Sequence, residues 1–157
     1  MPEKLLRFSF KFLAVSAPLA LLWFWKLQGY YEKLFIAVVG FLSVIFRTNL
    51  HLPIPAAFFH NLIPFTSLIL ISAPKLKVRV IWLLLVGWLI LLAEHLFLSL
   101  ILFLLLNLWK VGDSLYNWLF TPLSVVSGAF PFFLWILLMR MEISQLFLPK
   151  PYSSSPR

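Results

Sequence analysis

Long apolar runs alternate with short polar breaks along this chain. Four of the runs, at residues 8–25, 56–73, 80–109 and 123–139, consist mainly of aliphatic and aromatic side chains. A helix needs about twenty such residues to cross a hydrocarbon core of roughly 30 Å. The pattern therefore predicts an all-α integral membrane protein with four transmembrane helices, in which residues 80–109 form one long, tilted helix.

A fifth apolar segment, at residues 34–46, is shorter than a transmembrane helix. It lies between Lys33 and Arg47 and contains no charged residue. Apolar segments of about 10–14 residues are more often interfacial, re-entrant or buried in a bundle. We therefore expect an interfacial or re-entrant helix at the outer face. If residues 34–46 span instead, the chain has five transmembrane helices.

Prolines mark where the predicted helices begin, end or bend. Pro53 and Pro55 predict a loop, because proline lacks a backbone N–H and keeps the preceding residue extended. Thr121 followed by Pro122 predicts the N-cap and the first position of the last helix. Pro131 predicts a kink within that helix.

Composition indicates a lipid environment. Of the 157 residues, 62% are hydrophobic and 11% are charged, against about 45–50% and 25% in soluble domains. We expect residues 1–148 to form one multi-pass membrane domain and the Ser- and Pro-rich residues 149–157 to be a disordered tail. The absence of cysteine excludes disulfides, thiolate metal sites and a Cys nucleophile in this chain.

The basic residues indicate orientation in a membrane rather than nucleic-acid binding, because the 13 Lys and Arg are scattered between apolar runs. With four crossings and both termini cytoplasmic, nine lie inside and four outside, as the positive-inside rule favours, whereas five crossings give eight against five at best. We predict a bacterial-type inner membrane or a thylakoid-like membrane. The four-crossing arrangement also places an aromatic belt at the outer interface: Trp23, Trp25, Tyr30, Tyr31, Trp109, Tyr116 and Trp118.

Two ionisable residues, Glu94 and His95, lie in the middle of the longest apolar run. A charge at that depth costs about 2.5–3.5 kcal/mol unless it finds a partner. His95 lies about 22 Å from the inner end of its helix and His60 about 20 Å from the inner end of the preceding one. A short basic hairpin joins these two helices, so His60, Asn61, Glu94 and His95 can meet at one level.

The simplest role for this polar level is a clamp, in which Glu94, neutral or paired with His60, joins two helices by a hydrogen bond. The alternative is a site for a substrate, a partner or a proton relay. Two histidines at similar depth could also hold haem or a metal, but few small residues make room for a macrocycle. The chain also lacks a phosphate loop and a nucleophile elbow. We therefore predict no cofactor and no metal.

The sequence Asn-Leu-Ile-Pro-Phe-Thr-Ser-Leu-Ile-Leu-Ile-Ser-Ala-Pro-Lys-Leu-Lys-Val-Arg at residues 61–79 is followed by a long apolar helix with the polar pair Glu94–His95. This succession of helix, basic hairpin and helix resembles the central part of the exosortase and archaeosortase family, over about residues 58–100. Members of that family are multi-pass membrane transpeptidases that sort proteins carrying a C-terminal signal. The resemblance implies the membrane fold and a protein-sorting or membrane-complex setting.

The chain departs from this family at the catalytic position. The family's chemistry uses a Cys nucleophile at the head of the first of these helices, and this chain has His60 and Asn61 at that level. Without a thiol the covalent step has no nucleophile. The resemblance therefore implies the fold and not the activity.

The leading functional prediction is a non-catalytic accessory or assembly subunit of a membrane complex. Phe, Leu and Trp residues that can face lipid or partners are abundant, whereas few polar groups converge. The expected partners are membrane lipid and other membrane-protein subunits, not nucleic acid. The alternative is a membrane enzyme or transporter with a site at His60, Asn61, Glu94 and His95.

Overall fold

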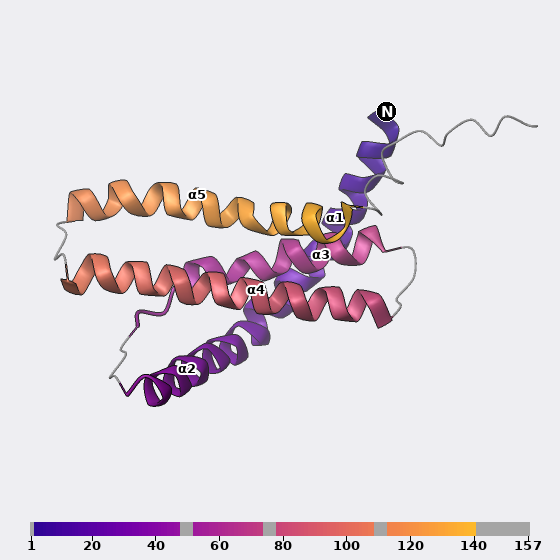
Figure 1. Ribbon diagram of the computed structural model, residues 1–157. Helices are drawn as coiled ribbons and strands as arrows, with labels where there is room; N and C mark the ends of the chain where they lie inside the picture. Colours follow the sequence, from indigo (N-terminus) through magenta and orange to yellow (C-terminus); the bar gives the residue numbers. More distant parts are fainter. Residues whose placement is uncertain (1, 48–51, 74–77, 109–112, 141–157) are drawn as a thin grey trace, which may run out of the picture.

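The computed structural model describes residues 2–47, 52–73, 78–108 and 113–140, and every regular element in these ranges is helical (Figure 1). The all-α prediction is confirmed, while the tail at residues 149–157 lies outside the described residues. Two π-helical turns, Trp23–Leu27 and Leu104–Leu108, and the 3-10 helix Ala56–Asn61 adjoin the α-helices. The α-helices are α1 (Pro2–Leu22), α2 (Gln28–Ile45), α3 (Leu62–Ser72), α4 (Val78–Phe103) and α5 (Asp113–Leu138).

Helices α1 and α2 form one continuous run. The π-helical turn between them keeps the backbone hydrogen-bonded, because the Gln28 N–H bonds to the Trp23 carbonyl five residues earlier. The run ends at Arg47, which takes a left-handed φ of 51°. Residues 34–45, expected to form a separate interfacial or re-entrant helix, therefore continue the first helix. The polar residues 26–33, which resemble a break in the sequence, are all helical.

Helix α3 is the shortest α-helix and has the largest share of buried residues. It contacts α1, α4 and α5, and Figure 1 shows it among these longer helices. Phe65 and Ile69 on α3 are fully buried. The helix stops at Ser72 because Pro74 disfavours helical geometry in the preceding residue, and Ala73 is accordingly extended.

Helices α4 and α5 run in opposite directions beside α3 (Figure 1). The long helix predicted at residues 80–109 is confirmed as α4, which the second π-helical turn extends to Leu108. Gly87 permits close packing between α4 and α3: a Cβ atom added there would lie 1.9 Å from Phe65 Cζ. The ring of Phe65 therefore fills the space that any other residue at position 87 would need.

The prediction that Thr121 and Pro122 begin the last helix is wrong, because α5 begins at Asp113 and contains both Pro122 and Pro131. Proline within a helix leaves one carbonyl without its usual N–H partner. Such a helix persists where neighbouring groups satisfy that carbonyl, as in many membrane helices. Pro131 is such a case, described below.

One end of the bundle, here called the Ser72 end, brings together the ends of α3 and α5 and the beginning of α1. The Trp135 Nε1–H donates a hydrogen bond to Ser72 Oγ at 2.9 Å. The Phe8 and Trp135 ring centroids are 5.9 Å apart. The opposite end, here called the Arg47 end, contains the end of α2 and the end of α4 (Figure 1).

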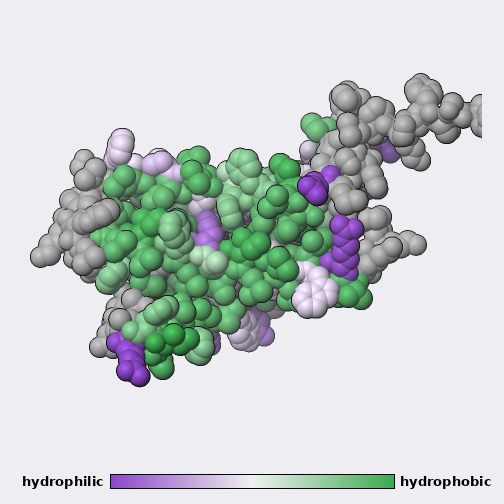
Figure 2. All heavy atoms as spheres, in the orientation of Figure 1, coloured by the Kyte–Doolittle hydropathy of each residue, from purple (hydrophilic) through white to green (hydrophobic). Residues whose placement is uncertain are grey.

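The outer surface of the bundle is largely apolar. In Figure 2 hydrophobic side chains cover most of the visible face, with hydrophilic ones mainly near its ends. Among the residues that the structure describes, three helical segments are long and apolar enough to cross a membrane: Leu5–Ile45, Val78–Leu106 and Trp118–Leu138. The remaining apolar segment, Ala56–Ser72, is shorter. The structure thus supports three of the four predicted spans by length and composition.

Candidate functional site

A buried hydrogen-bond chain joins three helical segments at mid-height of the bundle. Asn61, the last residue of the 3-10 helix, donates through Nδ2 to the Ser127 carbonyl at 2.9 Å and to Ser127 Oγ at 2.8 Å. The Ser127 hydroxyl on α5 donates to Glu94 Oε1 on α4 at 2.6 Å. Asn61 and Ser127 are both buried. The chain therefore connects the start of α3 with α5 and α4.

The missing backbone N–H of Pro131 explains why Asn61 donates a hydrogen bond to the Ser127 carbonyl. Pro131 has no backbone N–H, so the carbonyl of Ser127, four residues earlier, loses its helical partner. A buried carbonyl without a hydrogen bond is destabilising by about 1–3 kcal/mol. The Asn61 amide donates to this carbonyl. Pro131, which the sequence predicts to bend the helix, thus also leaves an acceptor in the core, and Asn61 satisfies it.

His95, the residue after Glu94, forms a second set of contacts. Its Nδ1 lies 2.8 Å from the Tyr31 hydroxyl of α2, and its Nε2 lies 3.1 Å from the Phe58 carbonyl. A carbonyl can only accept, so Nε2 carries the proton, and in a neutral imidazole Nδ1 then accepts from the Tyr31 O–H. His95 is fully buried, so both ring nitrogens are satisfied without water.

The two sets of contacts meet between Glu94 and His95. Glu94 Oε2 lies 3.6 Å from His95 Nε2, beyond hydrogen-bond distance, and this oxygen is buried without a hydrogen-bond partner among the described residues. The Tyr31–His95–Phe58 and Asn61–Ser127–Glu94 contacts are here called the polar cluster. Together they join α2, the 3-10 helix that precedes α3, α4 and α5.

The structure brings together three of the four predicted site residues, Asn61, Glu94 and His95. His60 is directed elsewhere: its ring packs edge-to-face against Phe24, with ring centroids 4.9 Å apart. Its Nδ1 is buried without a hydrogen-bond partner among the described residues. The predicted pairing of His60 with Glu94 is therefore not formed, because the 3-10 geometry turns His60 and Asn61 toward different helices.

Sequence reasoning missed Tyr31 and Ser127. The sequence predicts that Tyr31 belongs to an interfacial aromatic belt, and no periodic signal distinguishes it from Tyr30. Ser127 did have a signal, since it lies four residues before Pro131 in an apolar helix. A carbonyl freed at that position requires a donor from another segment, and Asn61 was an available donor.

Hydrogen bonds outside the polar cluster also join α3, α4 and the loop before the 3-10 helix. The Trp88 Nε1–H of α4 donates to Thr66 Oγ1 of α3 at 3.1 Å. Ser99 Oγ on α4 donates to the Pro53 carbonyl. Polar side chains therefore link neighbouring segments at several levels and not only at Glu94.

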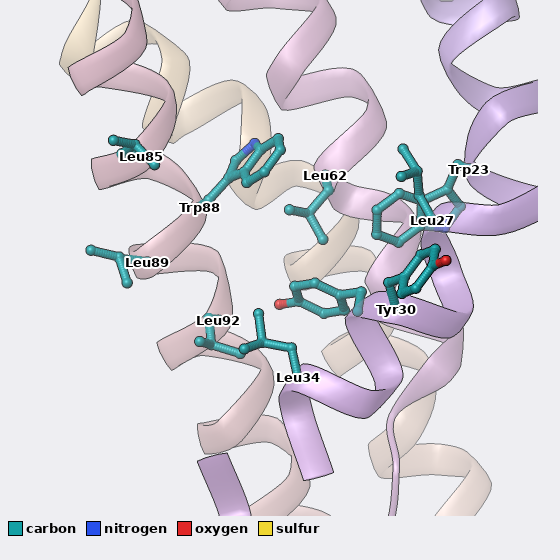
Figure 3. Close-up of a pocket in the computed structure, with 10 residues that line it drawn as sticks. Trp23, Leu27, Tyr30, Leu34, Leu62, Leu85, Trp88, Leu89 and Leu92 are labelled. Carbon is teal, nitrogen blue, oxygen red and sulfur yellow. The ribbon is translucent and has the colours of Figure 1, made fainter. Parts of the chain in front are cut away.

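An apolar pocket of about 310 Å³ lies beside the polar cluster. Figure 3 shows α4 side chains on one side of it and side chains of the π-helical turn and α2 on the other, with Leu62 between them. Tyr31 is the one member of the polar cluster that reaches the pocket. The lining residues are Trp23, Leu27, Tyr30, Tyr31, Leu34, Leu62, Leu85, Trp88, Leu89 and Leu92.

The side chains of the polar cluster bond to groups within the bundle and, apart from Tyr31, do not line the pocket. The Ser127 hydroxyl points its proton at a carboxyl group, but Ser127 is 2% exposed and the pocket is not lined by Ser127, Glu94 or Asn61. No group of three His, Asp or Glu side chains among the described residues is placed to hold a metal ion. Comparison with family models, curated proteins and solved structures gives no significant match for this chain.

Proposed function

We propose that this protein is a multi-pass membrane subunit without catalytic activity, whose polar cluster clamps its helices so that its apolar outer surface can engage other membrane proteins. The observation that carries the proposal is the pairing of the polar groups with one another. Asn61, Ser127 and His95 use their hydrogen-bonding atoms within the bundle. Little remains free to bind or convert a substrate.

The proposed topology has four crossings. The run of α1 and α2, then α3, α4 and α5, pass alternately between the Ser72 end and the Arg47 end (Figure 1). Arg7, Arg79 and Arg140 belong to segments at the Ser72 end, which we place in the cytoplasm by the positive-inside rule. Both termini are then cytoplasmic, in a bacterial-type inner membrane or a thylakoid-like membrane.

The long first run fits this topology as a strongly tilted helix. Leu5–Ile45 contains 41 residues, which at about 1.5 Å per residue is roughly 60 Å of helix, twice the hydrocarbon thickness. A tilt of up to about 40° accommodates part of this length, and the rest of the run extends beyond the hydrocarbon core. We therefore propose that residues 34–45 belong to the first crossing.

A large exposed apolar surface supports the role as a subunit. Within Leu5–Ile45 only Trp23, Phe35 and Val39 are buried in the bundle. Trp25, Leu21 and Val44 on this run are 85%, 75% and 77% exposed. Such a surface contacts lipid or another protein. The resemblance to exosortases suggests a protein-sorting or membrane-complex setting, which we include in the proposal as the setting alone.

A second candidate function, an enzyme or transporter using the polar cluster, is favoured by one observation: Glu94 Oε2 is buried without a hydrogen-bond partner among the described residues. A free carboxyl oxygen beside an imidazole can exchange a proton. This candidate requires a titratable group at position 94, whereas the clamp requires only hydrogen-bonding atoms there.

Two substitutions at one position separate the two functions. Glu94→Gln keeps the acceptor for Ser127 and should preserve both insertion and the cellular phenotype of the protein. Glu94→Leu removes the acceptor and should weaken helix association by about 0.6–2 kcal/mol. If Glu94→Gln inserts at the normal level but abolishes the phenotype, position 94 must titrate and the enzyme or transporter replaces the clamp.

A further inference from the structure

Two lysines on the long first run face outward without a carboxylate. Lys26 and Lys33 are both exposed, and they lie seven residues apart along the run, about two helical turns. Neither lysine forms an ion pair with another described residue, whereas Arg7 pairs with Glu3. Lys33 Nζ does lie 5.9 Å from the centre of the Tyr30 ring.

The acidic residue nearest to these lysines in sequence forms a hydrogen bond with a glutamine and not with a lysine. Glu32 is half-buried, and its Oε1 accepts a hydrogen bond of 2.9 Å from Gln28 Nε2. The two lysines outnumber this one carboxylate, so the outward surface formed by Lys26, Lys33 and the intervening Tyr30, here called the lysine face, has a net positive charge.

The depth of the lysine face in the proposed membrane span makes these two charges unusual. Tyr31, two residues before Lys33, is hydrogen-bonded to His95, which lies near the middle of the apolar segment Val78–Leu106. In the proposed topology both lysines are therefore well inside the membrane span. An unpaired lysine at the bilayer centre costs about 2.5–3.5 kcal/mol on insertion scales, and residues of this kind are usually paired.

The apolar pocket adjoins the lysine face. Tyr30 lines the pocket and also lies beneath the Lys33 ammonium group. Figure 3 shows Tyr30 and Leu34 on one side of the pocket, opposite Leu89 and Leu92 of α4. A helix lying against α2 and α4 can therefore insert apolar side chains into the pocket while a polar side chain meets the lysines.

We propose that the lysine face and the adjoining pocket bind a membrane-spanning helix of another protein that carries an Asp or Glu within its apolar stretch. The carboxylate would pair with Lys33 or Lys26, and large apolar side chains one or two turns away would fill the pocket. This inference rests on the proposed role as a membrane subunit and specifies the chemistry of the partner. It uses charge complementarity for specificity and apolar packing for contact area.

Two other occupants fit the charges less well. A second copy of this chain would bring its own Lys26 and Lys33 to the contact, and like charges at close range oppose association. An anionic lipid headgroup lies at the membrane surface, away from the level of the Tyr31–His95 contact. A partner helix can present a carboxylate at any depth.

The test uses the full chain in phosphatidylcholine vesicles together with a synthetic Leu- and Ala-rich transmembrane peptide bearing one central Glu. Because the protein contains no cysteine, a dye attached to Cys in the variant Ser153→Cys reports energy transfer to a dye on the peptide. The Glu peptide should bind about tenfold more tightly than an otherwise identical Gln peptide. The double substitution Lys26→Leu and Lys33→Leu should remove that difference, whereas Lys11→Leu, also exposed on the first run, should preserve it.

Each alternative gives a separate result. Equal binding of the Glu and Gln peptides overturns the proposal. Energy transfer between two copies of the chain that depends on Lys26 and Lys33 assigns the face to self-association instead, and a requirement for phosphatidylglycerol assigns it to lipid. The double-lysine variant must retain the helical circular dichroism of the parent, and the charge-preserving pair Lys26→Arg and Lys33→Arg should bind the Glu peptide normally. If the Glu and Gln peptides bind equally while the Glu94 variants behave as proposed, the acidic partner helix is refuted. The proposal that the polar cluster clamps the helices then still stands.

Discussion

The Tyr31 hydroxyl and His95 Nδ1 lie 2.8 Å apart, although 64 residues separate them in sequence. This contact fixes the long first run against the middle of α4. It also determines the form of the imidazole, because His95 Nε2 faces the Phe58 carbonyl at 3.1 Å and must donate to it. Tyr31 is therefore the donor to Nδ1.

The first prediction is that His95 is the neutral tautomer with the proton on Nε2. Solid-state NMR of protein labelled with ¹⁵N-histidine should show one ring with a protonated Nε2 and an unprotonated, hydrogen-bonded Nδ1. Tyr31→Phe should shift the Nδ1 resonance and destabilise the bundle by about 1–2 kcal/mol, because it leaves a buried acceptor unsatisfied. Tyr30→Phe is the matched control and should leave the His95 signals unchanged. A proton found on both nitrogens of His95 would contradict the assignment.

The second prediction concerns the contact between Gly87 and Phe65. Gly87→Ala places a Cβ atom 1.9 Å from Phe65 Cζ, so α3 and α4 must separate or the ring must shift. We expect a loss of about 1–3 kcal/mol in the free energy of unfolding in detergent. Gly40→Ala, where a Cβ atom meets nothing within 4 Å, should be neutral or stabilising. Phe65→Leu combined with Gly87→Ala should recover part of the loss, and equal stability of the two Ala variants would argue against this packing.

The third prediction concerns topology. Single cysteines can be introduced into a chain that has none and tested with a membrane-impermeant thiol reagent in intact cells. Cys at Arg47 and at Asp113 should react, because both belong to the Arg47 end, whereas Cys at Lys75 should be protected until the cells are permeabilised. Labelling at Lys75 with protection at Arg47 would contradict the four-crossing arrangement, because it fits either the inverted orientation or a separate fifth crossing by residues 34–46. Protection at both Arg47 and Lys75 would mean that Ala56–Ser72 does not cross.

The helical class and the long α4 could be predicted from sequence because they depend on apolar run length alone. The meeting of Asn61 with Glu94 and His95 could be predicted as well, because a short hairpin fixes the relative depth of two helices. The direction of His60 could not, since it depends on the 3-10 turn, which carries no periodic signal.

Two further features required the tertiary structure. The first run continues as a helix through the polar residues 26–33, and this continuity depends on one π-helical turn. The charged residues in this stretch are typical of a loop, so the sequence alone predicts a break there. The role of Tyr31 depends on which face of that run meets α4, which the extra residue in the π-helical turn changes. Ser127 could be predicted in part. Pro131 indicates that the Ser127 carbonyl lacks its helical donor, but it does not indicate which residue donates to that carbonyl instead.

The central claim is that the polar cluster holds the helices together, and the Ser127–Glu94 hydrogen bond of 2.6 Å is its most direct test. We propose a double-mutant cycle of Glu94→Leu and Ser127→Ala, with the free energy of unfolding measured in detergent for the parent, both single variants and the double variant. The matched control cycle replaces Ser127→Ala with Ser124→Ala, whose hydroxyl bonds to the Thr121 carbonyl within α5. The account predicts a coupling energy of about 0.6–1.7 kcal/mol for Glu94 with Ser127 and additive effects for Glu94 with Ser124. Additive effects in both cycles would contradict the clamp.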